Sequence, residues 1–168
     1  MQNNSVEYWL RGPVEGVPSL LQPVAHALLQ ANKEIQDIVK DFPKEKLWQK
    51  PAGVASVGFH LQHIVGVLDR LFTYSKGNSL TETQLDYLHK EGKEGDTLTS
   101  GDLAAALQQQ IHTSVAYLKT IDENTLTQAR PVGRKQLPST IMGLLFHAAE
   151  HTMRHTGQLL VTARVLMQ

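Results

Sequence analysis

The chain has 168 residues, with 16 Lys and Arg balanced by 16 Asp and Glu, eight His and no Cys. This length is enough for one well-buried core but short for two domains, so we expect a single domain over residues 1–168. The balanced charge gives no excess to attract nucleic acid or an anionic membrane surface, and the lack of cysteine excludes disulfides and a protein thiol nucleophile.

The sequence has no feature of an exported or membrane-spanning chain. No apolar run approaches the roughly 20 residues that a membrane span needs, and the N-terminal residues lack the apolar core of a signal peptide. We therefore expect a cytoplasmic protein that has a small molecule as its partner, and neither a membrane nor a nucleic acid.

The first part of the chain predicts an irregular arm followed by two long helices. Residues 1–17 include Gly12 and Pro13 and are expected to form the arm. Apolar residues at helical spacing then predict a first helix from about Pro18 to Phe42. After a polar connector, the same spacing predicts a second helix from about Ser56 to Tyr74.

A short extra helix is predicted between the second and third long helices. Two overlapping capping-box patterns, Ser79-x-x-Glu82 and Thr81-x-x-Gln84, open a helix that ends near His89. The glycines that follow indicate a loop before the next long helix.

The rest of the chain predicts two more long helices. A capping pattern at Thr99 begins the third, which runs to about Ile121. Residues 129–136 are expected to form a small hairpin around Gly133, and the last long helix covers 139–166. Four long amphipathic helices without a convincing sheet indicate an all-α four-helix bundle.

The last long helix contains His147, His151 and His155, each four residues from the next. A step of four residues advances about 40° around an ideal helix, so all three lie along one side. By this geometry His155 points into the apolar stripe, His151 lies at its margin and His147 further out. An unpaired buried polar group costs roughly 1–3 kcal/mol, so buried imidazoles need partners. A shared metal ion is one such partner.

The second helix contains His60 and His63. Measured from the apolar Ile64, His60 lies at about −40° and His63 at about −100°, so periodicity favours His60 as the inward residue. Bundles build metal sites from side chains on facing helices, which makes one histidine here and two on the last helix a sensible ligand set. The spacing leaves another interpretation open, in which the histidines are hydrogen-bonded residues at a helix interface or internal cavity.

Two motifs resemble those of the DinB/YfiT-like superfamily, the DNA-damage-inducible metal-dependent enzymes. They are Phe59-His-Leu-Gln-His63-Ile64 in the second helix and His151-x-x-x-His155-Thr-Gly-Gln158 in the last. The resemblance covers nearly the whole chain, in helix order and in motif spacing. It implies a four-helix bundle with up-down-down-up connections and a divalent ion held by three histidines.

The resemblance assigns the ligands residue by residue and disagrees with periodicity at one of them. It selects His63, His151 and His155, which makes His60 the dispensable member of its pair. His60 and His147 are then expected to contact one of the metal-binding histidines or to line the cavity beside the ion.

Residues 156–158 follow the last of these ligands. Thr156 replaces the basic residue usual in the family. Gly157 is expected to allow close helix approach beside the metal or ordinary tight packing. Gln158 either orients an imidazole or is a surface glutamine.

A three-histidine ion with open positions can act as a Lewis acid or lower the pKa of a bound water or thiol. Members of the superfamily include thiol-dependent S-transferases and isomerases, and a chain without cysteine could obtain a thiolate only from a low-molecular-weight thiol cosubstrate. The resemblance therefore implies a transferase or hydrolase, with zinc or nickel favoured and iron or copper also suited to histidine ligands.

No catalytic base can be named from the sequence, and other functions stay open. The main alternative is a non-catalytic, stress-responsive metal- or ligand-binding protein, forming a homodimer through an exposed bundle face. A structural bundle without a metal is the third interpretation.

Overall fold

The computed structural model describes residues 6–95 and 97–168, so the start of the predicted arm lies outside the described residues. The described part contains five α-helices and several short 3₁₀ turns. The α-helices are α1 (Gln22–Val39), α2 (Val57–Ser75), α3 (Glu82–Lys90), α4 (Ser100–Leu118) and α5 (Ile141–Leu166). The 3₁₀ turns are Tyr8–Leu10, Ser19–Leu21, Lys44–Lys46, Pro51–Gly53 and Glu123–Thr125.

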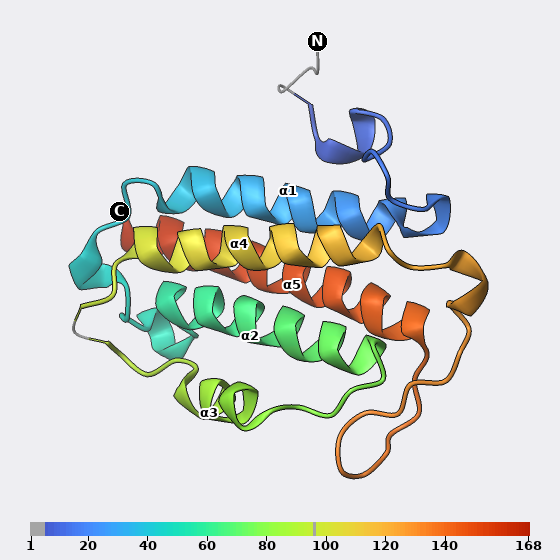
Figure 1. The fold of residues 1–168 in the computed structure, drawn as a ribbon. Helices are drawn as coiled ribbons and strands as arrows, with labels where there is room; N and C mark the ends of the chain where they lie inside the picture. Colours follow the sequence, from blue (N-terminus) through green and yellow to red (C-terminus); the bar gives the residue numbers. More distant parts are fainter. Residues whose placement is uncertain (1–5, 96) are drawn as a thin grey trace.

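The four long helices form a bundle in which helices consecutive in the chain are not the main neighbours. The most extensive contacts join α2 to α4 and α5, and α1 to the same two helices. Figure 1 shows that α2 and α4 run in one direction, and α1 and α5 in the other. Because α2 and α4 run parallel, the chain must return along the bundle between them, and α3 lies in this return segment against α2.

The helix ends follow the predicted capping chemistry with small shifts. The Thr81 and Thr99 capping boxes are both present, whereas the overlapping pattern at Ser79 is not used. The first helix begins at Gln22 after a 3₁₀ turn, rather than at Pro18. The last begins one residue after its N-cap Thr140, whose side chain accepts a hydrogen bond from the Gly143 amide.

The predicted hairpin is present only as two isolated antiparallel bridges. One joins Val132 to Leu137 and the other joins Ala129 to Thr140, with Gly133 at a positive φ in the turn. The described residues form no extended strand around it. The all-α class predicted from the sequence is therefore confirmed.

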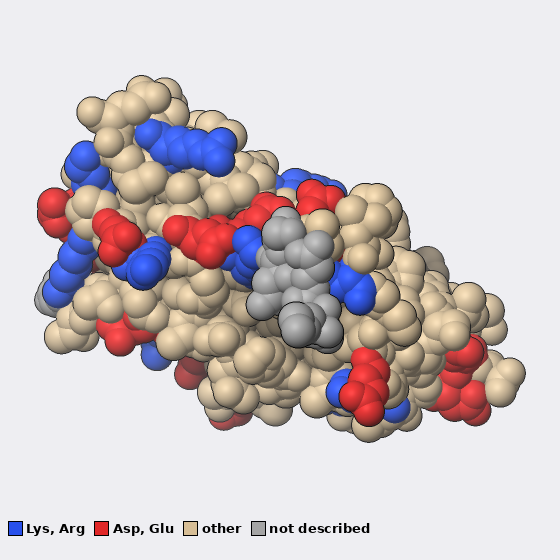
Figure 2. All heavy atoms as spheres, turned by 90° about the horizontal axis from the view of Figure 1, so that it is seen from above, with Lys and Arg blue, Asp and Glu red and all other residues tan. Residues whose placement is uncertain are grey.

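The stretch Pro51–Ser75 is long and apolar enough to cross a membrane by length and composition alone. In the bundle, however, 56% of the most apolar 18-residue segment of this stretch is buried. The apolar residues of α2 therefore serve as core, as expected for the central helix of a bundle. Figure 2 shows basic and acidic side chains interspersed over one face, without a large area of one sign.

The start of α2 is fixed by a close contact at Gly58. Its amide donates a hydrogen bond to the Leu47 carbonyl at 2.9 Å. A Cβ at this position would lie 2.6 Å from Cζ3 of the Trp48 ring. The indole therefore packs directly against the helix backbone, two residues before His60.

We predict that Gly58→Ala lowers the free energy of unfolding by about 1–3 kcal/mol, because the added methyl group must displace a packed indole ring. Urea unfolding followed by circular dichroism measures the change. Gly101→Ala is the matched control, because its Cβ would meet only the Thr99 hydroxyl at an ordinary 3.6 Å. Equal unfolding free energies for the Gly58 variant and the wild type would show that Trp48 yields at no cost.

Candidate metal centre

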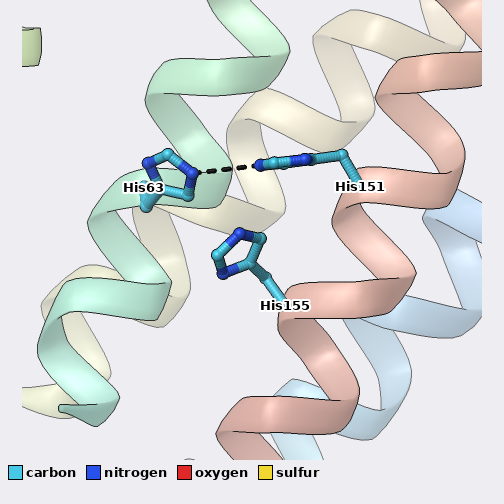
Figure 3. Close-up of side chains that lie close together, drawn as sticks. All are labelled: His63, His151 and His155. Atoms are coloured by element: carbon cyan, nitrogen blue, oxygen red, sulfur yellow. Dashed lines mark hydrogen bonds between the residues drawn. The ribbon is translucent and has the colours of Figure 1, made fainter. Parts of the chain in front are cut away.

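Three histidines from two helices bring ring nitrogens within 4.8 Å of one another. α2 supplies His63, and α5 supplies His151 and His155 from successive turns. Figure 3 shows the three rings converging, with Nε2 of His63 3.0 Å from Nε2 of His151. A tetrahedral ion about 2.0–2.1 Å from two nitrogens holds them roughly 3.3 Å apart, so the His63 and His151 nitrogens are close to the spacing that such an ion needs.

His60 is buried, as helical periodicity predicted, but it lies beside the three-histidine group rather than in it. Its exposed fraction is 2%, and its Nδ1 lies 2.9 Å from Nδ1 of His155. One of these two nitrogens must carry a proton and the other accept it. His60 is therefore placed to fix the orientation of the His155 ring.

His147 lies outside this group, on the exposed side of α5. Its Nδ1 contacts a carboxylate oxygen of Glu150 at 2.6 Å, and Arg154 binds the other oxygen at 2.6 Å. The centroid of the His147 ring is 5.2 Å from that of His151. His147 is thus a neighbour of His151 whose own nitrogen is paired at the surface.

Burial keeps the inner imidazoles neutral. Burial first, and then the nearby His63, lower the pKa of His60 to about 4 and that of His155 to about 3. The pKa of His151 is also lowered, chiefly by burial and then by His63. Neutral rings have a lone pair on one nitrogen, which is the form that binds a metal ion.

A buried ion pair that the sequence analysis missed contacts the His63 ring. Glu91 places Oε2 2.7 Å from Nδ1 of His63 and Oε1 2.5 Å from Nη1 of Arg70. The side chains of Glu91 and Arg70 are only 5% and 11% exposed. Each carboxylate oxygen therefore has its own partner away from solvent.

Part of this arrangement had a signal in the sequence. Arg70 follows His63 by seven residues, which on an ideal helix brings it back to within about 20° of the same side. Glu91 had no such signal, because it stands in a segment predicted only as a loop, just after α3. The contact depends on where the return segment lies against α2, which helical periodicity does not encode.

A pocket of about 630 Å³ opens between the start of α2 and the outer side of α5. His60 lines it, together with Met153, Arg154, Gly157 and Gln158. His60 therefore lies between the pocket and the three-histidine group, since it also contacts His155.

The structure tests the sequence predictions for Gly157 and Gln158 in the last helix. Both interpretations of Gly157 were wrong, because a Cβ there would meet nothing within 4 Å. Gln158 is exposed and lines the pocket, and among the described residues it makes no hydrogen bond to an imidazole. Neither residue contributes to close packing between helices.

The donor set fits a divalent ion. The group consists of three imidazoles whose nitrogens converge within 4.8 Å. Burial lowers the pKa of His151 and His155, which favours the neutral form that a metal ion binds. Imidazole-only ligation suits zinc, nickel, copper or iron.

Comparisons with known proteins agree with this fold. The sequence profile of the DinB superfamily matches residues 27–159. A conserved protein from Enterococcus faecalis is 19% identical, with a TM-score of 0.65 over 89% of this chain and 98% of that chain. A DinB-like protein from Bacillus subtilis is 21% identical, with a TM-score of 0.62 over 86% of this chain and 92% of that chain. No curated protein matches the chain.

Proposed function

Since the chain belongs to the DinB superfamily, we propose that His63, His151 and His155 together bind one divalent metal ion and that the protein is a metal-dependent enzyme acting on a small molecule. The observation that carries the proposal is the convergence of three imidazoles from α2 and α5 within 4.8 Å. Zinc or nickel is the metal we expect first, because both accept nitrogen ligands alone.

Zinc and nickel take four or more ligands. The three proposed histidines would therefore leave at least one position open for water or substrate. A divalent ion in such a site supplies Lewis-acid chemistry and lowers the pKa of a bound water or thiol. The pocket beside His60 is where a small substrate would bind, against the apolar side chain of Met153 and the amide of Gln158.

The residues around the three histidines favour chemistry that needs no carboxylate base. Glu91 is the buried carboxylate in contact with the group, and both of its oxygens are taken up by His63 and Arg70. Glu150 pairs with His147 and Arg154 at the surface. Proton removal from the nucleophile therefore depends on the ion more than on a neighbouring base.

We propose a transfer or hydrolysis reaction, with a low-molecular-weight thiol as cosubstrate in the transfer version. The sequence has no cysteine, so the protein cannot provide a thiolate itself. A thiol bound at the ion would lose its proton more readily at neutral pH and could then attack an electrophilic substrate. We place this activity in the cytoplasm.

The proposal includes a homodimer. Outside the pocket, α5 exposes the large apolar residues Phe146 and Val165, each at least half exposed. Exposed apolar side chains that gather on one side of a helix favour contact with another protein surface. A second copy of the chain would bury them.

The alternative function is a non-catalytic, stress-responsive binder of a metal or small ligand. One observation favours it: His60, rather than any of the three proposed ligands, lines the pocket. In that function the ion needs no access to a substrate.

We predict that His63→Ala, His151→Ala and His155→Ala each weaken zinc binding by more than the 10–100-fold typical of losing an outer partner, since each removes a ligand. Competition with a chromogenic chelator measures the affinity, and helical circular dichroism checks the fold. His60→Ala should retain one ion per chain with a smaller loss of affinity.

His147→Ala is the matched control, because this histidine is paired with Glu150 at the surface. It should bind zinc as the wild type does. Full zinc affinity in the His151 or His155 variant would overturn the proposed ligand set. Loss of stoichiometric binding in the His60 variant but not in the His63 variant would replace His63 by His60.

We predict that transfer activity on an electrophilic substrate needs both the metal and an added thiol. Metal-free protein, prepared by chelation, should be inactive, and stoichiometric zinc or nickel should restore activity. A panel of small electrophiles assayed with and without a low-molecular-weight thiol provides the measurement. Turnover without thiol would favour hydrolysis, whereas metal binding without any turnover would favour the non-catalytic binder.

A further inference from the structure

We infer that Glu91 is a positioning residue for His63. Arg70 holds the Glu91 carboxylate by an ion pair, and Gly66, which has no side chain, leaves the space that the carboxylate occupies. The inference rests on the proposed metal site, since it concerns one of the ligands. It gives a role to a buried ion pair whose side-chain hydrogen bonds, among the described residues, join Glu91 to Arg70 and to His63.

The hydrogen bond from His63 to Glu91 decides which ring nitrogen faces the site. An ionised carboxylate can only accept hydrogen bonds, so Nδ1 of His63 must donate across the 2.7 Å to Oε2. In its neutral form the His63 ring has one N–H, so Nε2 then keeps its lone pair. Nε2 is the atom that faces His151, at 3.0 Å, in the three-histidine group. Glu91 thus selects the tautomer that can bind an ion in this group.

Arg70 keeps the carboxylate in this position. Its Nη1 lies 2.5 Å from the second oxygen of Glu91, and both side chains are nearly excluded from solvent. A carboxylate that is hydrogen-bonded through both oxygens in a closely packed interior has little freedom to rotate. The pair therefore presents Oε2 to His63 as a fixed acceptor.

Gly66 provides the space in which the ion pair fits. A Cβ on Gly66 would lie 2.1 Å from Oε1 of Glu91, 2.6 Å from Nη1 of Arg70 and 2.9 Å from Cε1 of Tyr87. Glycine in the middle of a helix costs roughly 1 kcal/mol relative to alanine. Because Gly66 has no Cβ, the Glu91 carboxylate can approach the helix backbone between His63 and Arg70.

The segment after α3 is held against the same side of α2 by two further contacts. The Gly92 amide donates to Oε1 of Gln62 at 2.7 Å. Gly92 has a φ of +77°, and a Cβ there would lie 2.8 Å from Cδ2 of Phe59. The Phe59 ring is stacked on His63, with centroids 5.0 Å apart. Backbone and side-chain contacts therefore place Glu91 at the His63 ring.

The first test measures the His63 tautomer directly in metal-free protein. Long-range ¹H–¹⁵N spectra, recorded at a pH at which the His63 ring is neutral, distinguish the two tautomers. We expect the Nδ1–H form in the wild type and a mixture in Glu91→Gln, because an amide can either accept from Nδ1 or donate to it. A predominant Nε2–H form in the wild type, or an unchanged spectrum in the variant, would overturn the inference.

The second test measures zinc affinity by chelator competition. Glu91→Gln and Gly66→Ala leave all three proposed ligands in place, and each should weaken binding by about 10–100-fold. The matched controls are Glu82→Gln, an exposed glutamate at the start of α3, and Gly101→Ala, whose Cβ has only an ordinary contact. Both controls should bind zinc as the wild type does. Wild-type affinity in Glu91→Gln would contradict the inference even if Gly66→Ala misfolds.

The third test separates positioning from a general structural role. If Glu91 acts through His63, Glu91→Gln should have no further effect on metal affinity in a His63→Ala background. Cu²⁺ is the probe for this comparison, because it binds imidazoles most tightly among the divalent first-row metals and keeps the two-histidine site measurable. An equal fold-loss in both backgrounds would show that Glu91 only supports the fold. Failure of the wild type to bind any ion would overturn the metal site, while the tautomer measurement would still decide the role of Glu91.

Discussion

The packing of α2 against α5 is the constraint on which the site depends. It brings His63 within 3.0 Å of His151, although the two residues are 88 positions apart in the chain. Because α2 and α4 run parallel, the chain must return along the bundle between them, and this return carries Glu91 to the outer side of α2. The same topology therefore creates the histidine group and supplies the carboxylate that orients one of its rings.

Helical periodicity predicted what depends on a single helix. It predicted the four long helices to within a few residues and the inward position of His60. The capping patterns predicted the short helix and the N-caps Thr81 and Thr99. It placed His63 about 100° from the apolar stripe, and that side of α2 is indeed where the ring meets Glu91 rather than apolar core. The position that looked unfavourable for burial is a second interface, covered by the return segment. Only the family resemblance, which describes whole bundles, selected His63.

What the sequence did not predict depends on contacts between segments. Gly157 and Gly66 are both mid-helix glycines, and the conspicuous one, beside the histidine motif, proved to have nothing within 4 Å of its missing side chain. Gly66, which drew no attention, has three side-chain atoms within 3.0 Å of that point. A glycine becomes informative only when its neighbour across the interface is known, and here the neighbour is a carboxylate after α3. Glu91 was likewise not singled out from the sequence, because its neighbours on α2 were unknown and its segment was predicted only as a loop.

The three imidazoles are not equivalent, and the difference lies in their second nitrogens. Nδ1 of His63 faces a carboxylate, Nδ1 of His155 faces the neutral ring of His60, and the buried Nδ1 of His151 has no partner among the described residues. A carboxylate partner raises the basicity of an imidazole more than a neutral ring does, so the strongest donor of the group should be on α2. The i, i+4 pair on α5 then provides geometry, since two rings on one rigid helix have a fixed separation. In the proposed metal site, affinity would come mainly from the ligand on α2 and spacing from the pair on α5, and both depend on the contact between α2 and α5.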